Sequence, residues 1–263
     1  MAVLEAKRLN KTYGAKTVVN QVSLEISQKE IVGLLGPNGA GKTTTFRMMM
    51  GIIKPDSGGI FLDGHDITRL PLSQRARRGI GYLSQEPSIF RRLTVEQNIM
   101  VVLENMPFTK TERRKGCRQL LEEADLAHLA QRCAETLSGG EKRRLEICRA
   151  LAARPRIILL DEPFSGVDPI AVAELQEIIL QMKQRHIGVL ITDHSVRETL
   201  EVTDRAYIMH EGVILTQGTA KELINDPIVR ETYLGEKFYF REEPPKEEPS
   251  EQAKSKKNGR AKR

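Results

Sequence analysis

The sequence predicts an α/β protein whose core is a mostly parallel sheet, with an antiparallel β part near the N-terminus and an inserted helical lobe. Three observations lead to this fold class. A short apolar run at 31–35 opens into a glycine-rich loop and then a helix. Two further apolar runs, at 157–160 and 189–192, are joined by a helical segment, and such a βαβ unit requires parallel strands. Residues 86–154 carry little strand signal and have the pattern of charged amphipathic helices.

The first part of the chain is predicted to contain strands around one helix. Val22, Leu24 and Ile26 alternate with polar residues, which is the period of a half-exposed strand. The helix that follows the glycine-rich loop is expected to end at Gly51. Short apolar runs predict two more strands, at 60–62 and 80–83.

Capping patterns mark the helices of the second part. Thr94 with Gln97 forms a capping pattern at the entry to the helical lobe, and Asp168-Pro169 is typical of a helix start. After residue 240 the sequence is rich in charge, proline and serine, a composition typical of disorder. We therefore expect one nucleotide-binding domain at 1–240, with its core at about 1–85 and 155–240 and its lobe at about 86–154, and a disordered tail at 241–263.

Composition indicates an ordinary globular protein. Of the 263 residues, 40% are hydrophobic and 29% are charged, and no apolar run approaches the roughly 18 residues that a membrane-spanning helix needs. The first residues mix acids and bases with apolar side chains, unlike a signal peptide. The three cysteines, Cys117, Cys133 and Cys148, form no Cys-x-x-Cys pair. A cytoplasmic protein with reduced cysteines is expected.

The formal charge of +6 does not indicate a nucleic-acid-binding face. Six lysines and arginines and no acid lie in residues 254–263, and residues 1–253 hold 35 basic against 35 acidic residues. The body of the protein is thus formally neutral, and nucleic acid is not an expected partner.

The stretch from Gly36 to Thr43 matches the phosphate-binding pattern G-x-x-x-x-G-K-[ST], between a predicted strand and a predicted helix. Its glycines allow successive backbone N–H groups to face phosphates at the positive end of the helix. Lys42 would offset charge on the β and γ phosphates, and the Thr43 hydroxyl is a hard oxygen ligand suited to Mg²⁺. The pattern predicts binding of ATP or GTP.

Two acids follow the apolar run at 157–160, where ligands of open α/β sheets gather. Because successive strand side chains point to opposite faces, Asp161 and Glu162 are expected to have different roles. We predict that Asp161 belongs to the Mg²⁺ shell and that Glu162 activates the attacking water. His194 and Gln85 each follow another predicted strand, and taken alone a structural role fits them equally well.

A second glycine motif occurs at 137–141, Leu-Ser-Gly-Gly-Glu, before a helix. Ser138 and Glu141 form a capping box. This motif is either a well-capped helix start or a second anion-binding helix terminus, and its residues alone are compatible with both roles.

Taken together, GPNGAGKTT, Gln85, LSGGE, ILLDEP, the Ser-Gly-Val-Asp stretch at 165–168 and His194 occur in the order of an ABC transporter nucleotide-binding domain, which the chain resembles over about residues 3–240. The resemblance implies that Gln85 reaches Mg²⁺ and water and that His194 holds the γ-phosphate. It also implies a homodimer in which the glycine motif of one copy closes over ATP held by the other. The residues implied to contact ATP are Tyr13, Gly36, Pro37, Asn38, Gly39, Ala40, Gly41, Lys42, Thr43 and Thr44 in the same copy and Ser138, Gly139 and Gly140 in the other.

Finer features, among them GIGYLSQEPSIFRRLTVEQN and ITDHSVRETL, are similar to the lipopolysaccharide-export ATPases of that family. This implies a peripheral position at the inner membrane, on membrane subunits that Phe90, Arg91 and Arg92 help to contact, without direct contact to the transported molecule. Without the resemblance, Phe90 could equally be a core residue, and Arg91 and Arg92 could equally belong to a solvated surface that contacts no partner. Two alternatives stay open: a subunit for another substrate, such as branched-chain amino acids, and a soluble ABC protein that acts on nucleic acid.

Overall fold

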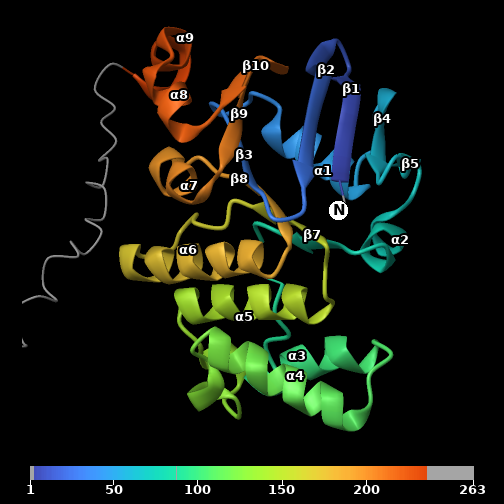
Figure 1. The fold of residues 1–263 in the computed structure, drawn as a ribbon, viewed down its shortest axis with the longest axis vertical. Coiled ribbons are helices and arrows are strands. Elements are labelled where there is room, and N and C mark those ends of the chain that lie inside the picture. The colour runs from blue at the N-terminus through green and yellow to red at the C-terminus, as the bar shows by residue number, and fades with distance from the viewer. Residues whose placement is uncertain (1–2, 87, 236–263) are drawn as a thin grey trace, which may run out of the picture.

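The computed structural model describes residues 3–86 and 88–235, so the predicted tail at 241–263 lies outside the described residues. Figure 1 shows β-sheets in the upper part of the molecule, two long helices crossing beneath them, and further helices at the bottom. The α/β fold class predicted from the sequence is confirmed. In the described part of the chain, no helix is both long enough and apolar enough to cross a membrane.

The larger sheet is mostly parallel. Its strands in chain order are β3 (Ile31–Leu35), β6 (Ile80–Leu83), β7 (Ile157–Asp161), β8 (Gly188–Thr192), β9 (Arg205–His210) and β10 (Val213–Gly218). In space they follow the order β10-β9-β3-β8-β7-β6, and only β10 pairs in the antiparallel sense. Strands β3, β7 and β8 are buried along their whole length because apolar residues occupy both faces. Their carboxyl ends meet along one edge, where ligands of such sheets bind.

A smaller antiparallel sheet forms the N-terminal part. It consists of β1 (Val3–Tyr13), β2 (Lys16–Ser27), β4 (Ser57–Leu62) and the short β5 (His65–Asp66), in the order β2-β1-β4-β5. The buried residues of β1 and β2 pack over α1 (Lys42–Met50), the helix that follows β3. The antiparallel sheet therefore covers the helix that begins at the glycine-rich loop.

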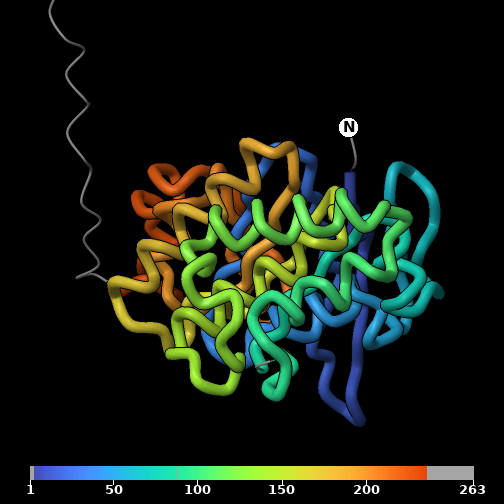
Figure 2. Tube along the Cα trace, turned by 90° about the horizontal axis from the view of Figure 1, so that it is seen from below, coloured from blue at the N-terminus to red at the C-terminus, as the bar shows by residue number. Residues whose placement is uncertain are grey.

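The helical lobe lies between β6 and β7 in the chain. It comprises α3 (Val95–Glu104), α4 (Lys110–Glu123), two short 3₁₀ turns and α5 (Gly139–Ala152). The capping boxes at Thr94 and Ser138 that the sequence predicts are both formed. The lobe shares one apolar cluster with the sheet, joining for example Val95 and Ile99 to Ile158. The lobe is consequently packed onto the core, and Figure 2 shows its green helices lying across the underside of the molecule.

The remaining helices flank the sheet. Helix α6 (Pro169–Gln184) begins at the predicted Asp168 cap and lies next to α5 (Figure 1). The others are α2 (Leu72–Arg77), α7 (Val196–Val202), α8 (Ala220–Asn225) and α9 (Pro227–Val229). Strands β1, β9 and β10 and helices α2 and α7 to α9 were not predicted from the sequence. Apolar residues of β1, β9, β10, α7, α8 and α9 belong to the apolar clusters or pack against them, whereas the buried residue of α2 is Arg75.

Candidate nucleotide-binding site

The glycine-rich loop leaves β3 and enters α1 with a backbone that only glycine adopts easily. Gly36 has φ 148° and Gly41 has φ 104°, and a Cβ on Gly36 would lie 2.0 Å from the Met209 carbonyl oxygen. By contrast, a Cβ on Gly39 would meet nothing within 4 Å, so the loop is open on that side. This geometry leaves room for a phosphate at the N-terminus of α1.

Lys42 is buried beside this loop, with 8% of its surface exposed. Its ammonium group donates hydrogen bonds to the carbonyl oxygens of Gly36 (2.6 Å) and Pro37 (3.0 Å). Burial lowers the pKa of the ammonium group, and the nearby carboxylates of Glu162, Asp193 and Asp161 oppose that shift. Lys42 is thus a buried cation held between the loop and the acids at the strand ends.

Asp161 ends strand β7 and is 3% exposed. Burial raises the pKa of its carboxyl group, and the hydroxyl of Thr192, which donates a 2.7 Å hydrogen bond from the end of β8, opposes the shift. A buried carboxylate next to a hydroxyl and a phosphate loop is a fitting ligand for a hard cation.

Glu162 and Asp161 have different surroundings, but not because they alternate along one strand, as was predicted from the sequence. Glu162 is not a strand residue: its φ of 47° places it in the left-handed region, where its N–H still donates to the Thr192 carbonyl at 2.7 Å. This turn directs the carboxylate toward the ends of neighbouring strands. Gln85 Nε2 donates to Glu162 Oε2 at 2.7 Å, and His194 Nδ1 lies 3.5 Å from the same oxygen. The structure therefore brings together the three side chains predicted to be catalytic.

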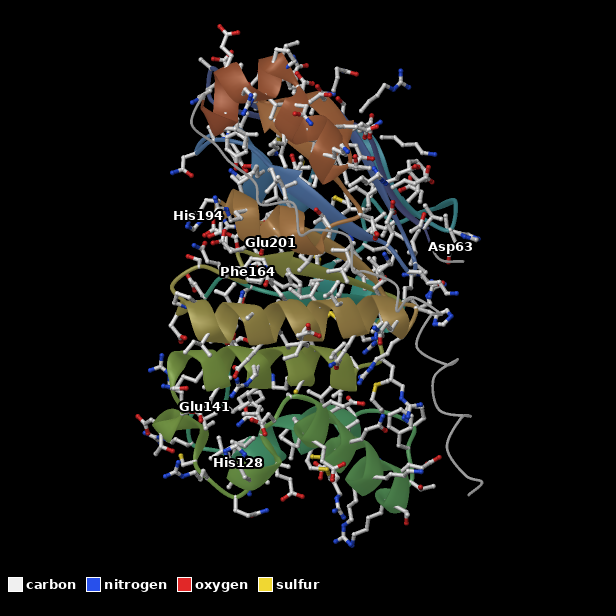
Figure 3. The ribbon with its side chains drawn as sticks, turned by 60° about the vertical axis from the view of Figure 1, so that its left-hand side comes forward. Asp63, His128, Glu141, Phe164, His194 and Glu201 are labelled. Carbon is white, nitrogen blue, oxygen red and sulfur yellow. The ribbon has the colours of Figure 1, made fainter. Side chains whose placement is uncertain are left out.

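Asp193 was not identified from the sequence, yet it joins two loops of this site. It is fully buried, and its two carboxylate oxygens accept hydrogen bonds from the backbone N–H groups of Phe164 (3.0 Å) and Ser195 (2.8 Å). Phe164 follows Glu162 by two residues, and Ser195 follows His194 directly. Figure 3 shows Phe164 and His194 along one edge of the molecule. The only sequence signal was an acid directly after a buried strand.

Arg143 in α5 was also missed, because arginines on a charged helix give no sign of burial. It is 7% exposed and donates hydrogen bonds to the backbone oxygens of Ser84 (2.8 Å), Asp161 (3.2 Å) and Glu162 (3.3 Å). Its guanidinium also pairs with Glu146 at 3.0 Å. Arg143 thereby links the helix after the second glycine motif to the loops that carry Gln85 and Glu162.

The second glycine motif begins α5, apart from this cluster. The Ser138 hydroxyl accepts a hydrogen bond from the Glu141 N–H at 3.3 Å, and the Glu141 carboxylate accepts one from the Ser138 N–H at 2.7 Å. Gly140 permits a close helix contact, since a Cβ there would lie 2.7 Å from the Ala171 Cβ in α6. Figure 3 shows Glu141, in the first turn of α5, on the same edge of the molecule as His194 but on a different layer.

The other predicted nucleotide contacts occupy the loop and its surroundings. Tyr13 ends β1 with 49% of its surface exposed, and Lys11 Nζ lies 5.5 Å from its ring centre. An exposed ring at this position is available for stacking on a base. Asn38 and Gly39 are exposed and Ala40 is buried, while Pro37, Thr43 and Thr44 are half-buried.

Mg²⁺ binding by Thr43, Gln85 and Asp161 fits the chemistry of these side chains, since all three offer hard oxygen donors. Among the residues at 3–86 and 88–235, no group of three or more His, Cys, Asp or Glu side chains is placed to hold a metal. A site with one carboxylate, one hydroxyl and one amide does not need such a group, because Mg²⁺ commonly completes its shell with water and phosphate oxygens.

A groove of about 300 Å³ lies at the far end of α5. Its lining comes from α2, β6, α3 and the last turns of α5, and includes Leu72, Tyr82 and Arg149. Phe90 is 46% exposed, and the Arg149 guanidinium lies 4.8 Å from its ring centre. Arg91 and Arg92 are exposed beside it, and the Arg91 carbonyl accepts from the Glu135 N–H at 3.0 Å. The three predicted contact residues are therefore exposed, and Phe90 contacts Arg149, which lines the groove.

A phosphate loop at the end of one parallel strand, with an aspartate and a glutamate at the end of another, defines a nucleotide-hydrolysing protein of the phosphate-loop class. Residues 19–165 match the family model for ABC transporters. The lipopolysaccharide export system ATP-binding protein LptB of Acidithiobacillus ferridurans is 54% identical over 236 residues, which cover 90% of this chain and 98% of that protein.

Solved structures agree with this assignment. An ATP-binding cassette named MJ1267, in its ADP conformation, superposes with a TM-score of 0.80 at 28% identity, covering 90% of this chain and all of that one. A dimeric cassette, MJ0796, superposes with a TM-score of 0.72 at 25% identity, covering 82% of this chain and 98% of that one. The chain belongs to the ABC transporter family, as an ATP-binding and ATP-hydrolysing subunit.

Proposed function

We propose that this chain powers lipopolysaccharide export by hydrolysing ATP between two copies of itself, beneath membrane subunits to which it binds. The observation that carries the proposal is the cluster of Gln85, Glu162 and His194 around one carboxylate oxygen, next to the phosphate loop. In this cluster Glu162 is the proposed base, Gln85 is a second polar contact, and His194 is the proposed contact of the γ-phosphate. The 54% identity to LptB over nearly its full length supports the export substrate rather than an amino acid.

In the proposed reaction, water attacks the γ-phosphorus in line with the leaving ADP. Glu162 orients this water and accepts its proton, and Gln85 holds the carboxylate by its hydrogen bond. Lys42 turns from the loop carbonyls to the β and γ phosphates, and His194 contacts the γ-phosphate. Thr43, Asp161 and Gln85 would hold Mg²⁺, which would neutralise charge on the phosphate oxygens.

The second glycine motif completes the site in trans. The N-terminus of α5 carries the backbone N–H groups and partial positive charge that an anion requires. In a twofold pair, Ser138, Gly139 and Gly140 of each copy would face the γ-phosphate bound by the other. ATP then joins the two copies, and hydrolysis releases them.

We propose that the membrane subunits bind in the groove beside Phe90. Arg143 would connect this groove with the catalytic loops, because it pairs with Glu146, which lines the groove, and donates to the Ser84 carbonyl next to Gln85. Docking there would place the chain on the cytoplasmic face of the inner membrane, away from the transported molecule. Arg91 and Arg92 would meet acidic groups of the partner.

Light scattering after size exclusion tests the pairing. A Glu162→Gln chain with ATP should elute as a dimer, and adding Ser138→Arg should return it to a monomer that still binds a fluorescent ATP analogue. If the double variant Glu162→Gln, Ser138→Arg still dimerises with ATP, Ser138 does not contact the ATP bound by the other copy, and the proposed pairing is contradicted.

Purification from detergent-solubilised membranes tests the partners. Mass spectrometry should identify lipopolysaccharide-export membrane subunits with the wild-type chain, and Phe90→Ala should reduce their recovery while leaving ATP binding intact. Recovery of amino-acid importer subunits instead would contradict the proposed substrate.

A further inference from the structure

A basic surface on α4 has no role in the proposed function. Residues 105–119, which comprise the loop before α4 and most of that helix, hold five lysines and arginines and a single acid, Glu112. The Glu112 carboxylate is engaged in the capping box, where it accepts from the Thr109 N–H at 2.7 Å. The buried residues of α4 are Cys117 and Leu121, so the basic side chains lie mainly on the outer face of the helix.

These charges do not stabilise the helix. Lys110 and Arg114 are four residues apart, and like charges at that spacing repel each other. Both also lie in the first turns of α4, where the helix dipole disfavours cations. Arg118, one turn further along, pairs with Glu122 at 2.8 Å. By contrast, Lys110, Arg114 and Lys115 are exposed and form no ion pair with any residue at 3–86 or 88–235, so they are available to an anionic partner outside the chain.

The start of α4 lies beside the groove that we assign to the membrane subunits. Phe108 precedes α4, and the Arg154 guanidinium lies 4.1 Å from its ring centre. Arg154 is exposed and directly follows Ala153, which lines the groove. The charge of Arg154 also contributes, after the hydrogen bonds from Thr109, to the lowered pKa of Glu112. Arg154 therefore extends the basic face of α4 toward the groove. We call this surface the α4 basic patch (Lys110, Arg114, Lys115 and Arg154).

The position of the patch favours a membrane over a nucleic acid as its partner. Figure 1 shows α4 at the end of the molecule away from the sheets, and membrane subunits docked in the neighbouring groove would bring it toward the lipid around them. The attraction of basic residues to an anionic leaflet fades within about 8 Å at physiological ionic strength, so only a surface close to the groove can use it. A nucleic acid would require a more extended basic surface, whereas residues 1–253 as a whole hold as many acidic as basic residues.

We propose that the α4 basic patch contacts the anionic headgroups of phospholipids in the membrane that holds the membrane subunits. This inference rests on the proposed docking in the groove and adds a lipid contact beside it. Phosphate oxygens accept charge-assisted hydrogen bonds from lysine and arginine, and clusters of about four or more such residues bind anionic membranes. The contact holds the helical lobe at the membrane surface and leaves the nucleotide site free.

The first test compares two triple variants of the full chain with the wild type, by co-sedimentation with vesicles of phosphatidylcholine, with and without phosphatidylglycerol. The patch variant neutralises three bases of α4: Lys110→Gln, Arg114→Gln and Lys115→Gln. The control neutralises three exposed lysines of the core: Lys29→Gln, Lys54→Gln and Lys221→Gln. Both variants keep the basic residues at 254–263, so any binding by that segment is common to all three proteins.

We expect the patch variant to bind the vesicles that contain phosphatidylglycerol about a hundredfold more weakly than the wild type, the combined effect of three basic residues near an anionic surface. The control variant should stay within about threefold of the wild type, because its lysines lie away from the patch. The removed charges oppose the helix dipole, so the Tm of the patch variant should be no lower than that of the wild type. ATP hydrolysis in solution should be equal in all three proteins.

A second measurement separates lipid from the membrane subunits. In detergent, where no bilayer is present, the patch variant should recover the membrane subunits as well as the wild type does. Equal vesicle binding by the patch and control variants overturns the inference. A loss of membrane subunits from the patch variant in detergent also overturns it, because the patch then contacts protein, as does a loss of binding to duplex DNA without a loss of binding to vesicles. If the wild type recovers no membrane subunits, the proposed docking is contradicted instead, and the vesicle comparison still decides the lipid contact.

Discussion

Gln85 and Glu162 are joined by a 2.7 Å hydrogen bond from the glutamine amide to the glutamate Oε2. Gln85 follows β6 at the entry to the helical lobe, whereas Glu162 follows β7, the core strand to which the chain returns from the lobe. The bond therefore joins the start of the connection into the lobe to the carboxylate that we propose to be catalytic. A movement of the lobe that displaces Gln85 would change this contact.

Glu162→Gln should lower the rate of ATP hydrolysis by about 10² to 10⁴, the usual contribution of a general base. The glutamine keeps an oxygen that can accept from Gln85, so the loop and the affinity for ATP should be preserved. Phosphate release under saturating ATP measures the rate, and a fluorescent ATP analogue measures the affinity. Glu177 is exposed on α6, so Glu177→Gln serves as the control that should leave turnover unchanged. Turnover within a few-fold of wild type would show that another group activates the water.

Asp193→Asn should lower both stability and kcat. The fully buried carboxylate accepts two backbone N–H groups, and an asparagine can accept only one of them, so about 2 kcal/mol of unfolding free energy should be lost. Because those bonds position the loops of Glu162 and His194, kcat should fall while the KM for ATP changes less. Urea unfolding and steady-state kinetics measure the two effects. The exposed Asp125→Asn should change neither, and a stability loss with unchanged kcat would restrict Asp193 to a structural role.

Local patterns were sufficient to predict the parts of the site that depend on sequence neighbours. The phosphate loop, the buried strand before it and the Ser138 capping box each depend on residues within a short window. Asp193 and Arg143 could not be predicted, because their partners lie 29 and up to 59 residues away in the chain. Strand β1 was missed because its bulges interrupt the alternation of apolar and polar residues.

Arg75→Met should destabilise the protein more than a typical substitution. The Arg75 side chain is fully buried, and it donates to the carbonyl oxygens of Met48 (3.0 Å) and Met49 (2.5 Å) at the end of α1, as well as to Leu70 and Thr68. Burial lowers the pKa of Arg75 to about 10, which leaves it charged at neutral pH. Methionine fills similar space but removes these four hydrogen bonds. Within the described residues only the Met48 carbonyl keeps a second donor, the Gly51 N–H, so we expect a loss of about 3 kcal/mol. Thermal unfolding should show a Tm lower by roughly 10 °C, with exposed Arg77→Met as control.

The cysteines should differ in reactivity according to their burial. Burial raises the pKa of both Cys117 and Cys148 to about 12, so at pH 8 almost none of either thiol is ionised. Cys133 is only half-buried. A maleimide at pH 8 should therefore label Cys133 first, and all three should react at similar rates in guanidinium chloride. Rapid labelling of Cys117 or Cys148 in the native protein would contradict the packing described for the lobe.

The capping box at Ser138 should give a small pH-dependent contribution to stability. The Ser138 N–H donates to the Glu141 carboxylate at 2.7 Å, and this bond, followed by that of the Ser138 hydroxyl, lowers the pKa of Glu141. A lowered acid pKa stabilises the folded state above the unfolded pKa, and the contribution is lost as pH falls through the folded value. Glu141→Gln keeps the shape of the box without the charge. Because Glu141 is only half-buried and solvent screens its charge, the unfolding free energy of the wild type should exceed that of the variant by less than about 1 kcal/mol at pH 7. Urea unfolding at pH 7 and near pH 3 measures the difference, which should vanish at the lower pH. A difference that persists at low pH would mean that packing, rather than charge at the start of α5, accounts for the role of Glu141.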